Sequence, residues 1–157
     1  MRQRRNGESG TMVTEAALAS VAFAMFLFSI FDFCHIYYVR SMLQHAVSEA
    51  ARYATIGGTM EDPLNPGQQL SRQDSVLAVI DNYSLVDIDQ GDISLTAING
   101  SGQQVAGPGG PGDVMTVRVT HSVDIITPLL GTLFPPGGYQ FSTSASFRNE
   151  EFPGAGS

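Results

Sequence analysis

Hydrophobic residues fall into two different patterns along the chain. Residues 16–39 are nearly all apolar, and no charged side chain occurs in this run before Asp32. At about 1.5 Å per residue, a helix of this length reaches across a hydrocarbon core about 30 Å thick. Tyr37 and Tyr38 then stand beside Arg40, the order expected at a membrane interface. The pattern therefore predicts a membrane-spanning helix over about residues 16–39.

The helical pattern continues past the membrane span, but it becomes amphipathic. Arg40, Gln44, Ser48 and Arg52 mark a polar face. The other face is apolar and holds Val39, Leu43, Ala46, Val47, Ala50 and Ala54. Gly57-Gly58 supplies a stop signal. We therefore expect a single helix over residues 11–56, long enough to reach about 69 Å at the same rise.

Residues 57–157 read as a small mixed domain. Ser71 is a good helix N-cap, with Asp74 three residues on, and a short amphipathic helix should follow. Three stretches then alternate apolar with polar residues, as strands do: Ile93, Leu95 and Ala97; Met115, Val117, Val119 and Val123; Phe141, Ala145 and Phe147. The fold class expected is α+β, with a small antiparallel sheet and one short helix packed on the second half of the long helix.

Arginine distribution predicts the orientation. Arg2, Arg4 and Arg5 precede the apolar run and Arg40 follows it, so the N-terminus should be cytoplasmic and residues 57–157 extracytoplasmic. A removable secretory signal fits less well, because no clean small-x-small cleavage site follows the run. We expect a single-pass protein of the cytoplasmic (inner) membrane.

Charge and composition exclude several functions. The net charge is −7 and lysine is absent, which argues against nucleic-acid binding. The lone Cys34 cannot form an internal disulfide. His121 falls on the apolar phase of its strand, and the aspartates of residues 87–92 fail the calcium-loop spacing. We expect no enzyme activity, no cofactor and no metal site.

The residues before the apolar run carry a more specific signal. Gly10 follows a basic segment, and Glu15 stands five residues beyond it, directly before the apolar stretch. This arrangement resembles the processing site of type IV pilin-like proteins. The resemblance implies a leader of residues 1–10, cut between Gly10 and Thr11 by a prepilin peptidase while the helix stays in the membrane.

Other segments resemble the TadE-like (tight adherence) family. They are residues 48–54, residues 112–117, and residues 128–131 followed by 141–148. The resemblance implies a minor pseudopilin of a Tad-type adhesive pilus. Its partners would be the prepilin peptidase, other Tad pilins or pseudopilins and the inner-membrane assembly platform, and the subunit could enter the pilus itself. The alternative is an uncleaved, single-span binding module anchored in the periplasm or at the cell surface.

Three ionisable residues near the membrane have two interpretations each. By resemblance, Glu15 would pair with the new amino group of a neighbouring subunit's Thr11 and set the subunit register, or it is an interfacial residue favoured by the helix dipole. Asp32 and His35 share a helix face, so they either contact another helix or mark the interface.

A last apolar stretch lies between the second and third strands. It holds Leu129, Leu130, Leu133 and Phe134 and ends in Pro135-Pro136. It could pack inside the domain or present a surface to a partner.

Overall fold

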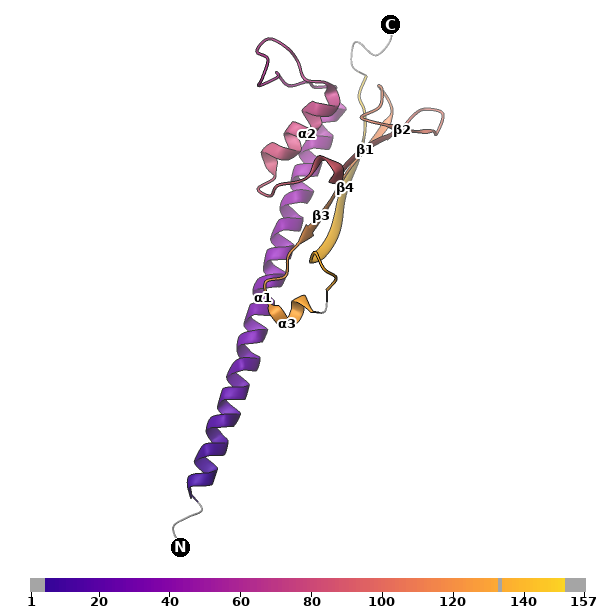
Figure 1. Cartoon of the computed structure of the whole chain (residues 1–157). Coiled ribbons are helices and arrows are strands. Elements are labelled where there is room, and N and C mark those ends of the chain that lie inside the picture. Colours follow the sequence, from indigo (N-terminus) through magenta and orange to yellow (C-terminus); the bar gives the residue numbers. More distant parts are fainter. Residues whose placement is uncertain (1–4, 133, 152–157) are drawn as a thin grey trace. The chain divides into compact units, whose positions relative to one another are not determined.

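The structure is a computed structural model that describes residues 5–132 and 134–151 (Figure 1). The described elements, in chain order, are α1 (Arg5–Thr55), α2 (Arg72–Tyr83), the 3₁₀ turn η1 (Gln90–Asp92), β1 (Ile93–Ile98), β2 (Gln104–Ala106), β3 (Val114–Val123), α3 (Pro128–Gly131) and β4 (Tyr139–Arg148). A long N-terminal helix is thus combined with short helices and an antiparallel sheet. The predicted α+β class is confirmed.

The long helix begins earlier than the sequence suggests and ends where expected. α1 starts at Arg5, six residues before the predicted start at Thr11. Its last residue is Thr55, after which Gly57 adopts a positive φ of 69° and donates its N–H to the Ala54 carbonyl at 3.1 Å. The glycine stop is confirmed, because this left-handed conformation favours a residue without a Cβ.

The chain divides into two compact units. Met1–Tyr37 and Val123–Tyr139 form the first, which we call the apolar unit. Tyr38–Ser122 and Gln140–Ser157 form the second, which we call the sheet unit. Each is described below by itself.

The sheet has four strands in the order β2-β1-β3-β4. β1 and β3 are antiparallel neighbours, with Leu95 opposite Val117 and Ala97 opposite Met115. The three predicted strands are all present. β2 was not predicted, because its three residues are all exposed and show no alternation of buried and exposed positions.

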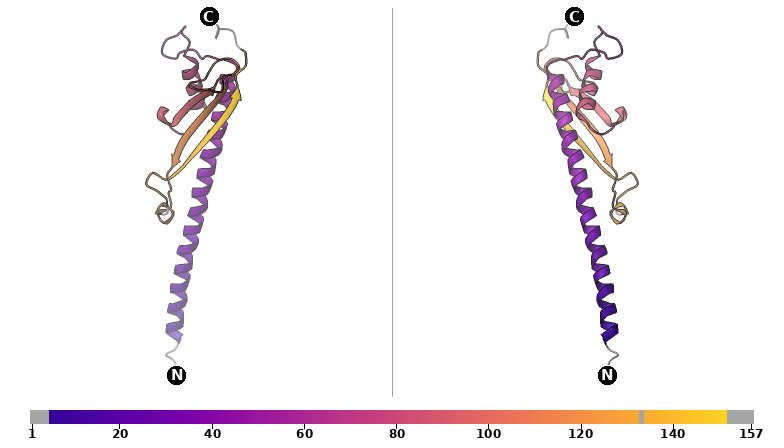
Figure 2. Two further views of the ribbon diagram at one scale, coloured as in Figure 1. Left: turned by 90° about the vertical axis from the view of Figure 1, so that its right-hand side faces the viewer. Right: turned by 90° about the vertical axis from the view of Figure 1, so that its left-hand side faces the viewer.

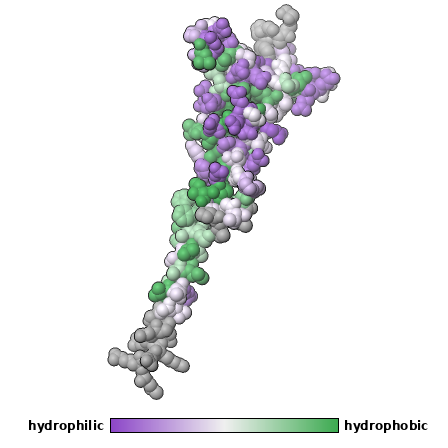
Figure 3. All heavy atoms as spheres, in the orientation of Figure 1, coloured by the Kyte–Doolittle hydropathy of each residue, from purple (hydrophilic) through white to green (hydrophobic). Residues whose placement is uncertain are grey.

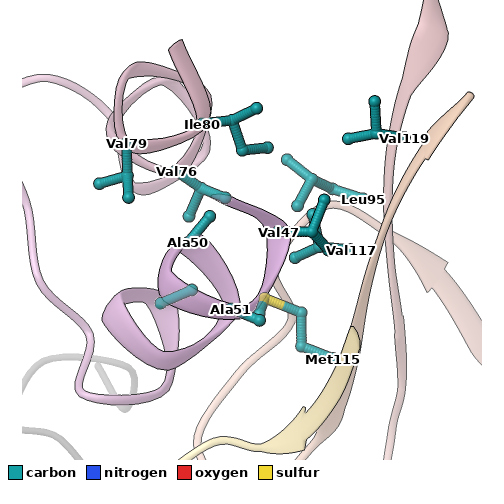
Figure 4. Packing of buried hydrophobic residues seen from close by; sticks show 11 residues of the cluster. Val47, Ala50, Ala51, Val76, Val79, Ile80, Leu95, Met115, Val117 and Val119 are labelled. Carbon is teal, nitrogen blue, oxygen red and sulfur yellow. The ribbon is translucent and has the colours of Figure 1, made fainter. Parts of the chain in front are cut away.

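The core of the sheet unit lies between the second part of α1, α2 and the sheet (Figures 2 and 4). α1 contributes small residues, so that the neighbouring backbones come close. α2 and the sheet contribute larger ones, and the side chains point toward one another in Figure 4. The fully buried members of the cluster are Val47, Ala50, Ala51, Ala54, Val76, Ile80, Met115, Val117 and Val119. The amphipathic face predicted for residues 39–54 is therefore confirmed.

α2 starts where the sequence predicts. The Ser71 hydroxyl accepts from the Asp74 N–H at 3.1 Å and donates to the Asp74 carboxylate. This pair satisfies a backbone donor that the first helical turn leaves open, an effect that typically contributes about 1 kcal/mol.

Polar groups close the C-terminal end of α1 within the sheet unit. The Arg72 guanidinium donates to the Ala54 carbonyl at 2.7 Å and to the Gly109 carbonyl at 2.6 Å. The buried Asn149 amide donates to the carbonyls of Pro108 and Gly110, both at 2.8 Å. Burial lowers the pKa of Arg72, and the guanidinium still carries its charge at neutral pH. These bonds connect α1 and α2 with the glycine-rich residues 107–112, and nothing in the sequence indicated them.

Candidate functional site

The first part of α1 presents an apolar surface on all sides. It is long and apolar enough to span a membrane, and little of it is buried within the chain. Figure 3 shows several green, hydrophobic residues along this part of α1. The exposed aromatic side chains in this part of α1 include Phe23, Phe26, Phe28, Phe31 and Phe33. Water would hydrate such a surface poorly, whereas lipid or neighbouring apolar helices would cover it well. The helix is therefore a candidate membrane span.

The candidate processing site lies inside α1. Gly10 and Thr11 are both helical and exposed, and the Thr14 hydroxyl donates to the Thr11 carbonyl at 2.8 Å. Within the described part of the chain, no neighbouring atom would contact a Cβ placed on Gly10. Packing therefore gives no reason for glycine at this position. Arg2 and Arg4 of the predicted leader lie outside the described residues.

Glu15 stands just over one helical turn beyond this site. Its side chain is exposed, and it lies four residues after Thr11, on the same face of the helix. The role of Glu15 in subunit register stays a prediction.

Asp32 and His35 have different surroundings, although they lie one turn apart. The Asp32 side chain is only 3% exposed. Its two carboxyl oxygens accept the backbone N–H groups of Ile126 at 2.9 Å and Thr127 at 3.0 Å. His35 is exposed. Asp32 thus binds a segment of its own chain 94 residues away, while His35 stays accessible to a partner. The contact of either residue with another subunit stays a prediction.

The segment bound by Asp32 belongs to the apolar unit. It contains the one-turn helix α3, whose Gly131 N–H donates to the Thr127 carbonyl at 2.9 Å. The Phe134 ring then meets the Tyr139 ring edge-on, with centroids 6.1 Å apart. Leu133 lies outside the described residues. The apolar connection predicted here therefore contains a helical turn and is attached to the first part of α1.

A glycine closes this segment tightly. Gly138 has a φ of +81°, and a Cβ placed on it would lie 2.2 Å from the Val123 carbonyl oxygen. A side chain at position 138 would force this carbonyl to move. The turn that leads into β4 therefore requires glycine.

The residues considered for metal binding were His121 and the aspartates of residues 87–92. Among the described residues, no group of three His, Cys, Asp or Glu could hold a metal ion. His121 is half-buried and meets the Phe141 ring edge-on, with centroids 6.3 Å apart. It has the surroundings of a histidine at the edge of the core, as its strand position predicted.

Comparison with protein families finds a match in the N-terminal part of the chain. Residues 10–52 match the family model described as TadE-like protein. This segment is similar to TadE-like proteins. The match begins at Gly10, includes the candidate membrane span and extends into the α1 residues of the core. The later segments that resemble the family in sequence, from residue 112 onward, lie outside it. TadE-like proteins are a family of pilus components. Comparisons with curated proteins and with solved structures find no match.

Proposed function

We propose that the chain is a minor pseudopilin that assembles with, or primes, a Tad-type adhesive pilus. The TadE-like match over residues 10–52 carries this proposal. In this proposal a prepilin peptidase cuts between Gly10 and Thr11 on the cytoplasmic side, and the sheet unit lies outside the cytoplasm. Other Tad pilins or pseudopilins and the inner-membrane assembly platform are the partners.

The exposed apolar surface of α1 supports this function. A helix that is apolar on every side can be covered by lipid before assembly and by neighbouring helices afterwards, because both environments exclude water. The uncharged run over residues 16–31 makes either environment acceptable. The helix would therefore leave the bilayer for a filament without exposing its aromatic residues to water.

The conformation around Gly10 supports the cleavage step. A peptidase must reach the backbone between Gly10 and Thr11, which here is part of a helix. Glycine in a helix interior is about 1 kcal/mol less favourable than alanine, so the helix opens more easily at this point. A glycine that no packing contact requires is consistent with recognition by an enzyme.

Glu15 would act after cleavage. The new amino group of Thr11 in one subunit would pair with the Glu15 carboxylate of its neighbour. In an apolar surrounding such a pair is directional, and it sets the register of packed helices more than it adds net stability.

The decisive experiment compares Gly10→Leu with Gly7→Leu in cells that carry the pilus system. Intact-mass measurement of the membrane-fraction protein should give a mature chain that starts at Thr11 for the unchanged protein and for Gly7→Leu. Gly10→Leu should accumulate with residues 1–10 retained, because the bulky side chain replaces the last residue of the leader.

The opposite result has a clear meaning. If the unchanged protein keeps its leader, the chain is an anchored binding module that is never cut, and the pseudopilin proposal is wrong. If Gly10→Leu is trimmed normally, the cleavage position is wrong.

A further inference from the structure

The inference concerns the segment that Asp32 holds, residues 125–132. We propose that this segment inserts into the lipid head-group boundary and gives the protein a second membrane contact beside the helix. The inference depends on α1 spanning the membrane, which the proposed function also requires, but it does not depend on cleavage of the leader.

The depth of residues 125–132 in the membrane follows from the position of Asp32, to which they are hydrogen-bonded. Asp32 lies five residues before Tyr37, which is about 7–8 Å along a helix toward the middle of the apolar run. Tyr37 and Tyr38 are exposed and mark the expected interface. Since the N–H groups of Ile126 and Thr127 bind Asp32 directly, the backbone of the segment lies on the hydrocarbon side of these tyrosines.

The chemistry of the segment fits this depth. The sequence has no Asp, Glu, Lys, Arg or His from Ile125 to Tyr139. Ile126 is 74% exposed, while Ile125 and Leu130 are half-buried. A large exposed aliphatic side chain at this level has lipid as its nearest apolar surrounding.

Hydrogen bonds explain how the backbone of residues 125–132 can lie close to hydrocarbon. Peptide N–H groups that approach hydrocarbon need an internal acceptor, because no water is available there. Asp32 provides one for Ile126 and one for Thr127, and the Thr127 carbonyl accepts from Gly131. The carboxylate, itself costly in an apolar surrounding, is satisfied by the same bonds. The same hydrogen bonds thus allow both the Asp32 carboxylate and the backbone of the segment to lie in an apolar surrounding.

The test places a fluorescent bimane label at a single cysteine in the full chain, reconstituted in phosphatidylethanolamine/phosphatidylglycerol vesicles. Ile126→Cys is made in a Cys34→Ala background, and the backbone N–H that binds Asp32 is retained. The unchanged protein, labelled at its only cysteine, Cys34, is the reference for the span. Ser94→Cys in the Cys34→Ala background, at an exposed position of β1, is the reference for water.

We expect lipids with a doxyl quencher near the head group to quench the label at position 126, as they quench the label at Cys34. Ser94→Cys should be unaffected. A charged maleimide should react with Ile126→Cys at least about tenfold more slowly than with Ser94→Cys, because a charged reagent does not enter hydrocarbon.

Three results would overturn the proposal. If position 126 behaves like position 94 while Cys34 is quenched, the second contact is absent but the membrane span stands. If Cys34 is not quenched either, the span itself is wrong, and the proposed function falls with the inference. If position 126 is protected but not quenched, and copies cross-link through it, another copy of the chain covers the segment instead of lipid.

Discussion

The two compact units use apolar residues in opposite ways. In the sheet unit, valine, isoleucine and alanine side chains are buried against one another in a core between α1, α2 and the sheet. In the apolar unit, the phenylalanines of α1 are exposed, whereas the charged residue Asp32 is only 3% exposed. One unit has a hydrophobic core, and the other has a hydrophobic surface.

This difference shows that a single helix is adapted to two surroundings. Its first part carries large aromatic residues, which suit a fluid or a multi-helix apolar environment. Its second part carries alanines at 46, 50, 51 and 54, which let α2 and the sheet pack closely. The change between the two occurs near Tyr37 and Tyr38, where the compact units also divide.

The largest effect that tests this contrast comes from a matched pair of substitutions. Ile80 is fully buried in the sheet unit, so Ile80→Ala should reduce the free energy of unfolding by roughly 2–5 kcal/mol. Leu18 is 78% exposed, and Leu18→Ala should change the free energy of unfolding by less than about 0.5 kcal/mol. Urea unfolding of the full chain in detergent micelles, followed by circular dichroism, measures both values. Equal losses would show that the first part of α1 belongs to the same folded core.

A smaller effect is expected from the buried carboxyl group of the apolar unit. Asp32→Ala removes the acceptors of the Ile126 and Thr127 N–H groups, and each unsatisfied buried group costs about 1–3 kcal/mol. Hydrogen exchange at these two amides should therefore become roughly tenfold faster or more. Asp32→Asn keeps one acceptor oxygen. Its exchange rates at these two amides should therefore lie between those of the unchanged protein and those of Asp32→Ala. The Val117 amide, in the sheet unit, is the internal control.

Unchanged exchange at Ile126 and Thr127 in Asp32→Ala would show that the carboxyl group does not hold the segment. Faster exchange at Val117 as well would show that the two units unfold together. Either result would contradict the view that Asp32 holds residues 125–132 independently of the core of the sheet unit.

The parts of the fold that depend on local sequence were predictable. Helix length follows from an unbroken pattern, the helix stop from Gly57-Gly58 and the start of α2 from the Ser71 cap. The early start of α1 at Arg5 was missed, because the polar residues before Gly10 have no apolar periodicity. β2 was missed because both its faces are exposed.

The candidate site was predictable to the extent that its signals are short motifs. Gly10 and Glu15 are recognisable by their spacing, and Asp32 stands out as a charge in an apolar run. The partner of Asp32 was not predictable. Ile126 and Thr127 bind it through backbone N–H groups, which every residue except proline possesses, and they lie far away in the sequence. Only the fold brings them together.

The smallest effect concerns a second aspartate, Asp62 in the sheet unit, whose carboxylate also accepts two hydrogen bonds but is in contact with water. The Asp62 carboxylate accepts the Leu64 N–H at 2.8 Å and the Asn65 side-chain amide at 2.7 Å. The Asn65 amide, followed by the Leu64 N–H, lowers the pKa of Asp62 below its ordinary value of 3.8. A lowered folded-state pKa means that this contribution to stability is complete above pH 3.8 and is lost as the pH falls through the folded-state pKa.

The amide resonance of Leu64 should therefore titrate with a midpoint below 3.8, and Asp62→Asn should abolish that titration. A midpoint at or above 3.8 would show that the two bonds are not formed in solution. Asp62→Ala should disturb the protein less than Asp32→Ala, because water can satisfy the Leu64 and Asn65 donors once the carboxylate is gone. Equal effects of the two alanine variants would show that burial does not distinguish the two aspartates. The backbone N–H groups bound by Asp32 would then be as accessible to water as those bound by Asp62.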